Sequence, residues 1–162
     1  MALSLDGELP QRDSSKEFDK AWRSVKDSIT FVHKNLVNHG VLSSDLLPAH
    51  NALIPLFFLH AHFQGEFNFD RGFRWFLLAI GDGRYSGSAA TTLGHDIKLV
   101  KAAKSFDDAV VALEKELRIS GEFSPEDFQR DYREDFYGLM LYLCAFSARS
   151  QGLDASGHQG RL

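Results

Sequence analysis

Apolar residues recur at helical spacing along most of the chain. The first segment carries six of them, three or four positions apart, in one stripe: Phe18, Trp22, Val25, Ile29, Val32 and Leu36. This stripe predicts a helix of about six turns. A capping box of Ser14 and Glu17 marks its start, and Gly40 marks its end.

The same spacing and the capping residues predict further helices downstream. A second helix should run from about Pro48 to Gly65, with a kink or break at Pro55. A third, Arg71 to Ile80 with Asp70 as its cap, is apolar on most sides. Residues 81–90 contain three glycines and two serines and therefore predict a loop.

Four more helices complete the predicted fold. One runs from Thr91 or Thr92 to about Ala103, and Ser105 caps the next. Residues 124–127 predict the start of a short acidic helix. The last, Arg133 to Arg149, is apolar all round, which predicts a place in the middle of the bundle. We predict an all-α, single-domain bundle of six to seven helices, with flexible segments at residues 1–13 and 151–162.

Composition and charge narrow the function classes. The lone cysteine, Cys144, lies in an apolar run, which predicts a buried thiol without a disulfide partner and a cytoplasmic location. The apolar runs fall short of the roughly 20 residues that span a bilayer. Residues 71–104 hold six basic and two acidic residues, whereas residues 105–135 hold ten acidic and four basic ones. The basic stretch is a candidate phosphate-binding face, and two solvated helix faces are the alternative.

Catalytic chemistry finds little support in the residues. A metal-dependent phosphohydrolase is the third functional hypothesis. Its metal ligands would be His60, His62, His95 and Asp96, with Asp127, Asp131 or Asp135 as a last ligand. Residues two apart on a helix point about 200° apart, so His60 and His62 cannot share one ion. The glycine-serine loop lacks the Walker spacing and a preceding strand, and no nucleophile motif occurs. We predict no cofactor, no metal and no catalytic residue.

One pattern resembles a known family. It consists of a tryptophan on the first helix, a proline-containing apolar helix, an aromatic helix and a glycine-serine loop before an aspartate: Trp22, Leu47-Pro48, Ala52-Leu53-Ile54-Pro55-Leu56, Arg74-Trp75-Phe76, Gly83-Arg84-Tyr85-Ser86-Gly87-Ser88, Thr92-Leu93 and Asp96-Ile97. Over residues 15 to 150 this order resembles the helical C-terminal part of GmrS-like proteins, which include GmrSD-type modification-dependent restriction endonucleases of bacteria. The nucleotide-hydrolysis and His-Asn-His nuclease motifs of such proteins are not present in the sequence.

The resemblance implies a non-catalytic module of a restriction or phage-defence protein. Such a module would bridge the missing nucleotide-hydrolysing and nuclease domains of a longer chain, or help position DNA. The basic stretch supplies the candidate DNA contacts: Arg71, Arg74, Arg84, Tyr85, Lys98 and Lys101. Alternatively, Arg84 and Tyr85 fix the loop onto the bundle, with Arg84 bound to helix-end carbonyls or to Asp96. A stand-alone helical interaction protein is the second functional hypothesis.

Overall fold

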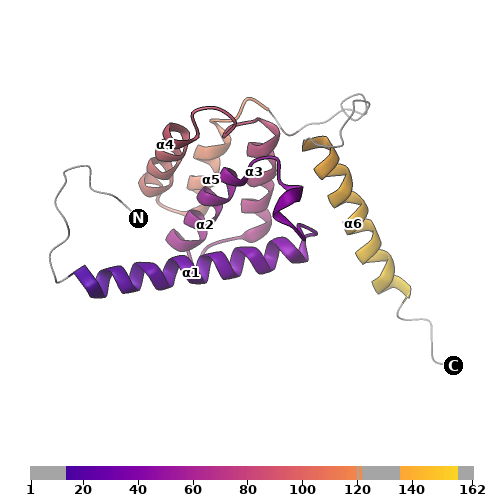
Figure 1. The fold of residues 1–162 in the computed structure, drawn as a ribbon, viewed down its shortest axis with the longest axis horizontal. Coiled ribbons are helices and arrows are strands. Elements are labelled where there is room, and N and C mark those ends of the chain that lie inside the picture. Colours follow the sequence, from indigo (N-terminus) through magenta and orange to yellow (C-terminus); the bar gives the residue numbers. More distant parts are fainter. Residues whose placement is uncertain (1–13, 120, 122–135, 157–162) are drawn as a thin grey trace.

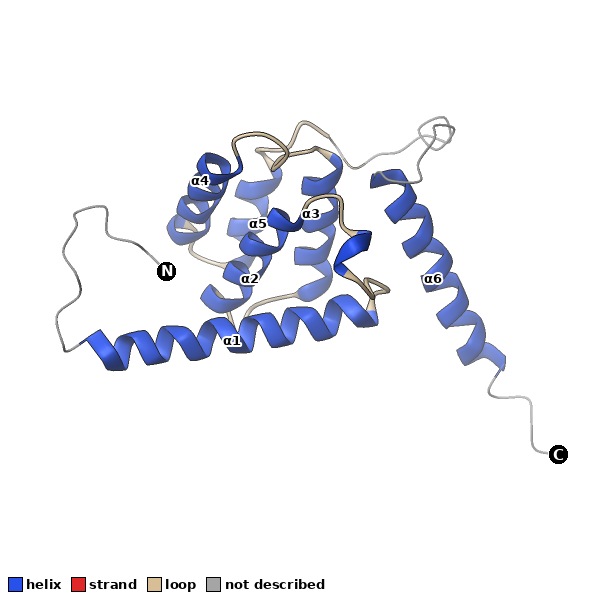
Figure 2. Cartoon of the chain, viewed as in Figure 1, coloured by secondary structure: helices blue, strands red, loops and turns tan. Residues whose placement is uncertain are grey.

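The fold of the chain is all-helical. A computed structural model describes residues 14–119, 121 and 136–156, and these residues form six α-helices and no strand. The elements in chain order are α1 (Ser14–Asn38), two short 3-10 turns (Ser44–Leu46 and His50–Ala52), α2 (Leu53–His62), α3 (Phe69–Gly81), α4 (Ala89–Ala102), α5 (Phe106–Glu114) and α6 (Phe136–Ser156). The predicted all-α bundle is confirmed (Figure 2).

Helix α2 lies at the centre of the arrangement. It packs against α1, α3 and α4, while α5 packs against both α3 and α4. Helix α1 runs along one side of this group, and its first turns extend beyond the neighbouring helices (Figure 1). At 25 residues α1 is about 37 Å long, whereas the ten residues of α2 span about 15 Å.

The apolar stripe of α1 is only partly covered by the other helices. Val32 and Leu36 are buried beside the other helices. Four upstream members remain exposed, with exposed fractions of 60% for Phe18, 53% for Trp22, 37% for Val25 and 44% for Ile29. The part of α1 that faces the bundle instead includes Ser28, which is fully buried. The rotation of α1 explains the difference, because Ser24 and Ser28 contact the end of α2 and the turn after it. Val25 and Ile29 each follow one of these serines and therefore point about 100° away from that face.

Aromatic rings fill much of the core. Trp75 and Phe76 of α3 are fully buried, and Phe73 stacks on Phe76 with 6.0 Å between ring centroids. Phe67 and Phe106 meet edge to face at 5.1 Å, which joins the turn after α2 to the start of α5. Several phenylalanines of the described residues are therefore packing residues of a helical core.

Local signals at the helix ends are partly as predicted. The Ser105 side chain accepts a hydrogen bond from the Asp108 amide at 3.1 Å, which confirms the predicted cap of α5. Asn68, not Asp70, caps α3, because its side chain accepts from the Arg71 amide. Pro55 does not break the second helix. That helix begins only at Leu53, so Pro55 lies in the first turn, where no intrahelical amide bond is lost.

Helix α6 lies at the edge of the bundle rather than in its middle (Figure 1). It packs against α3, and two of its rings sit against glycines: Phe136 against Gly81 and Phe146 against Gly40. A Cβ at either glycine would approach those rings to 2.8 Å or less. Cys144 is exposed, contrary to the predicted buried thiol, because its side of α6 faces away from the bundle.

The C-terminal boundary also differs from the prediction. Helix α6 continues to Ser156, six residues into the segment that was expected to fray from position 151. The predicted acidic helix at 124–127 and the N-terminal segment 1–13 lie outside the described residues. Within the described residues, no helix has both the length and the apolar character needed to cross a bilayer.

Candidate functional site

The glycine-serine loop between α3 and α4 carries the residues that the sequence singles out most strongly. Its Arg84 side chain reaches Asp96 on α4 and donates two hydrogen bonds to that carboxylate, from Nε at 3.0 Å and from Nη2 at 2.5 Å. The Tyr85 hydroxyl donates a third to Asp96 Oδ2 at 2.5 Å. Asp96 is fully buried, and the Arg84 side chain is only 9% exposed. These three residues are called the Asp96 cluster below.

The Asp96 cluster also contacts the turn after α5. Arg84 donates from Nη1 to the backbone carbonyl of Glu116 at 2.9 Å, and its Nη2 lies 3.6 Å from the Glu116 carboxylate. His95 Nε2 lies 3.2 Å from the same carboxylate at the surface. The predicted bond between Arg84 and Asp96 is therefore confirmed, and the carbonyl that Arg84 also contacts, that of Glu116, lies two residues after the end of α5.

Electrostatics keep the protons of the cluster in place. Burial raises the pKa of the Tyr85 phenol well above its usual value, and the hydrogen bond to the Asp96 carboxylate raises it further. The hydrogen bond to Asp96 also raises the pKa of the Arg84 guanidinium. Tyr85 thus remains a neutral donor and Arg84 a permanent cation, so neither group is poised to transfer a proton near neutral pH.

A second polar contact fastens the same end of the bundle. Asp82, buried at the end of α3, accepts from the Arg118 amide at 2.9 Å. The Arg118 guanidinium also donates a hydrogen bond to the Asp82 carbonyl at 2.6 Å. Together with the Asp96 cluster, this contact joins the α3–α4 loop to the segment after α5. The arrangement is that of a structural clamp, with its donors and acceptors satisfied internally.

Two of the predicted DNA contacts are paired with acids of the neighbouring helix. Arg71 Nε lies 3.1 Å from Asp107, and Arg74 donates to Glu114 at 3.0 Å. Both acids belong to α5, so part of the basic stretch neutralises part of the acidic stretch. The structure therefore gives Arg71 and Arg74 protein partners, just as it buries Arg84 and Tyr85 in the Asp96 cluster.

Among the described residues, Lys98 and Lys101 are the exposed candidate DNA contacts without an acidic partner, since the exposed Arg74 is paired with Glu114. They lie three residues apart on α4, and neither forms a salt bridge with another described residue. The Lys101 ammonium lies over the Phe58 ring, 6.0 Å from its centroid. Any phosphate-binding role of the predicted basic face rests on these two side chains.

The histidines do not converge. His60 is buried, its ring stacks on Phe31 at 4.3 Å, and its Nδ1 lies 2.9 Å from the Ser28 hydroxyl. Because Ser28 donates its own proton to the Ser24 carbonyl, His60 Nδ1 is the donor. His62 is exposed on the other side of the helix. Within the described residues, no three His, Cys, Asp or Glu side chains lie where one metal ion could bind.

Asp96 is likewise engaged elsewhere, since the Asp96 cluster occupies both of its oxygens. The remaining ligands considered for a metal, Asp127, Asp131 and Asp135, lie outside the described residues.

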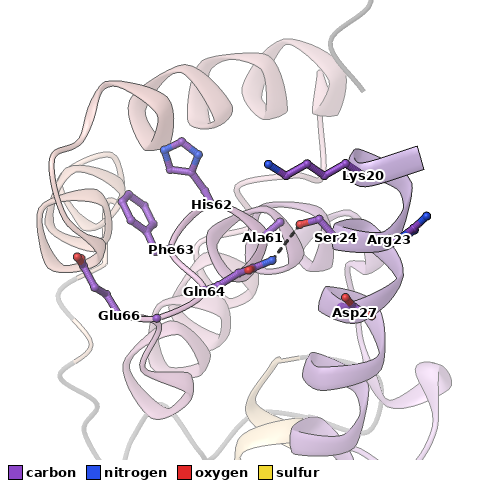
Figure 3. Close-up of a pocket in the computed structure, with 10 residues that line it drawn as sticks. Lys20, Arg23, Ser24, Asp27, Ala61, His62, Phe63, Gln64 and Glu66 are labelled. Carbon is purple, nitrogen blue, oxygen red and sulfur yellow. Dashed lines mark hydrogen bonds between the residues drawn. The ribbon is translucent and has the colours of Figure 1, made fainter. Parts of the chain in front are cut away.

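A groove lies between α1 and the end of α2 (Figure 3). This groove has a volume of about 640 Å³. Lys20 extends from α1 toward the side of His62, and Gln64 donates to the Ser24 hydroxyl at 3.1 Å (Figure 3). Asp27 and Glu66 line the groove as well, so its charges are of mixed sign. It therefore favours no single charge of ligand.

No protein-family model, no curated protein and no solved structure matches the chain. The similarity to GmrS-like proteins accordingly stays a prediction that depends on the motif order given above.

Sequence reasoning missed two surfaces, namely the groove and the uncovered part of the α1 stripe. The stripe was visible as a pattern, but its exposure was not. No local pattern indicated that Ser24 and Ser28, rather than the neighbouring stripe, would contact α2 and the turn after it. The groove gave no comparable signal, since its lining comes from separate segments.

Proposed function

We propose that this chain is a non-catalytic helical module that acts by binding another protein surface, as the helical part of a GmrS-like restriction protein that bridges catalytic domains. One observation carries the proposal: Phe18, Trp22, Val25 and Ile29 lie in one exposed stripe on α1. Single exposed apolar residues are ordinary, but a contiguous row of large ones is typical of an interaction surface. The name exposed α1 stripe is used below for these four residues.

The polar groups support a scaffold rather than an enzyme. The Asp96 cluster and the Asp82–Arg118 contact satisfy one another and hold the loop between α3 and α4. A rigid support of this kind keeps α3, α4 and α5 in fixed positions behind α2, which in turn supports α1. The exposed α1 stripe is thus presented on a preorganised surface, which reduces the entropy lost on binding.

The size of the native polypeptide tests the module hypothesis. An antibody raised against this chain should detect, in native cells, a band several times heavier than 18.2 kDa. A band at 18.2 kDa would contradict the module and favour the alternative, a stand-alone helical interaction protein.

DNA positioning is a second candidate function, favoured by the exposed Lys98 and Lys101. Replacing both by glutamate should weaken duplex binding and lower the slope of log affinity against log salt by about 2, because each lysine would contribute about one phosphate contact. Lys115, exposed near the end of α5, provides the matched control when it is replaced by glutamate. Fluorescence anisotropy at several salt concentrations measures both quantities. An unchanged salt slope in the double variant would remove α4 as a DNA-binding face.

A further inference from the structure

The exposed α1 stripe follows a heptad spacing. Phe18 and Val25 are seven residues apart, as are Trp22 and Ile29, so the four occupy alternating d and a positions. This spacing is that of a seam between two helices, and it continues into the buried Val32 and Leu36 without a break. The exposed part of the seam lacks a partner within the described residues, although its geometry is that of a helix pair.

The stripe is complementary to itself when two copies of α1 run in opposite directions. In an antiparallel pair centred between Trp22 and Val25, those two residues face each other across the axis. Phe18 of one copy then faces Ile29 of the other. Every apolar side chain of the stripe meets another apolar side chain. A twofold axis of this kind gives the isologous contact of most homodimers.

Charge selects the antiparallel orientation. Asp19 and Lys26 both occupy e positions, next to the stripe and exposed on the side away from the bundle. In the antiparallel pair, the positions of Asp19 in one copy and Lys26 in the other differ by about 3 Å along the axis. A lysine side chain spans that distance. Each copy then supplies one Asp19 and one Lys26, so two ion pairs form.

In a parallel pair, e positions would face g positions instead. Those are Ser14, Ala21 and Ser28, none of which carries a charge. The charge pattern therefore has a use only in the antiparallel arrangement. Neither Asp19 nor Lys26 forms a salt bridge within the described part of the chain, so both are available to a partner.

We infer that the occupant of the exposed α1 stripe is a second copy of this chain, paired antiparallel through residues 18–29. This inference rests on the proposed function and names its partner. The pairing area comes mainly from Phe18 and Trp22, which are more than half exposed and bury roughly 100 Å² each. The whole seam is smaller than a standard interface of about 1,600 Å² in total. The dimer is therefore weak and depends on concentration.

Sedimentation velocity of the whole chain from low to high micromolar concentration tests the pairing. The mass should rise from 18.2 kDa toward twice that value. Trp22→Ala, which keeps a good helix former on α1, should leave the chain monomeric over the same range. Leu42→Ala is the matched control, because Leu42 is 59% exposed but lies outside α1, and it should dimerise as the unaltered chain does.

Charge reversal tests the orientation. Asp19→Lys or Lys26→Asp alone should raise the dissociation constant about tenfold, because each turns two attractive pairs into two repulsive ones. The double variant Asp19→Lys/Lys26→Asp should restore the original constant. Circular dichroism of each variant verifies that α1 still forms.

Three outcomes would overturn the inference: a mass of 18.2 kDa at every concentration, dimerisation that survives Trp22→Ala, or a double charge variant that stays as weak as the single ones. None of them bears on the size of the native polypeptide, so the module hypothesis is tested separately.

Discussion

Removing the Asp96 carboxylate is the sharpest test of the clamp between α3, α4 and α5. In Asp96→Ala the Arg84 guanidinium loses two hydrogen bonds and its buried counter-charge, and the Tyr85 hydroxyl loses its acceptor. Arg84 keeps the Glu116 carbonyl and the more distant Glu116 carboxylate, but its side chain is 9% exposed and solvent cannot replace the missing Asp96 carboxylate. The variant therefore leaves a buried charge whose remaining acidic partner is 3.6 Å away and 38% exposed.

The magnitude follows from that burial. Breaking a buried ion pair by deleting one partner costs about 3–5 kcal/mol of unfolding free energy. For a chain of this size each kcal/mol shifts the melting temperature by about 2–4 °C. Asp96→Ala should therefore lower the melting temperature by roughly 6–20 °C. Tyr85→Phe removes a single hydrogen bond to a charged group and should cost about 1.5–3 kcal/mol.

Urea unfolding followed by circular dichroism measures these values. Arg84→Met should also destabilise, because it leaves Asp96 buried without its cation. The pair Arg84→Met/Asp96→Ala should cost less than the sum of the two single changes, since no buried charge is left alone. The reasoning would be refuted if Asp96→Ala cost less than about 1 kcal/mol, a value typical of an exposed ion pair, or if the two changes were additive.

Three further predictions concern pH and packing. Burial lowers the pKa of His60 below 6.5, so the unfolded chain binds more protons than the folded one. Stability should therefore fall as pH drops from 6.5 toward the folded pKa. His60→Gln should flatten this decline in urea titrations, whereas the control His62→Gln should not. The raised pKa of Tyr85 has the opposite consequence, so stability should fall as pH rises above 10, and Tyr85→Phe should remove this loss in the same titrations. Gly40 has a φ of +94°, and a Cβ there would lie 2.8 Å from the Phe146 ring. Gly40→Ala should therefore lower the unfolding free energy by about 1–3 kcal/mol and speed amide hydrogen exchange in α6. Unchanged exchange would contradict the contact.

Local signals predicted much of the fold. The cap at Ser105 and the loop at residues 81–90 could be read from the sequence because each depends on neighbours only a few residues away. Pro55 was misjudged because the start of its helix was misplaced by five residues, which moved the proline from a forbidden position to a tolerated one.

Tertiary context decided the features that could not be predicted. The all-round apolar pattern of α6 indicated a central helix, yet α6 lies at the edge and exposes Cys144. In the candidate site, the partnership of Arg84 with Asp96 was foreseen as one alternative, because the two are only 12 residues apart. The pairing of Arg74 with Glu114 was not, since the 40 residues between them give no pattern that links the two.

The Asp96 cluster constrains how this chain can change over evolution. An uncharged residue at position 96 would strand the Arg84 charge, and an apolar residue at position 84 would strand the carboxylate, so either change alone is selected against. The two positions should therefore be replaced together or not at all. Position 85 should keep its hydroxyl donor only where an acceptor for it remains. Distant relatives of this bundle would then share an arginine-tyrosine pair followed by an aspartate eleven residues after the tyrosine, even where the rest of their surfaces has diverged.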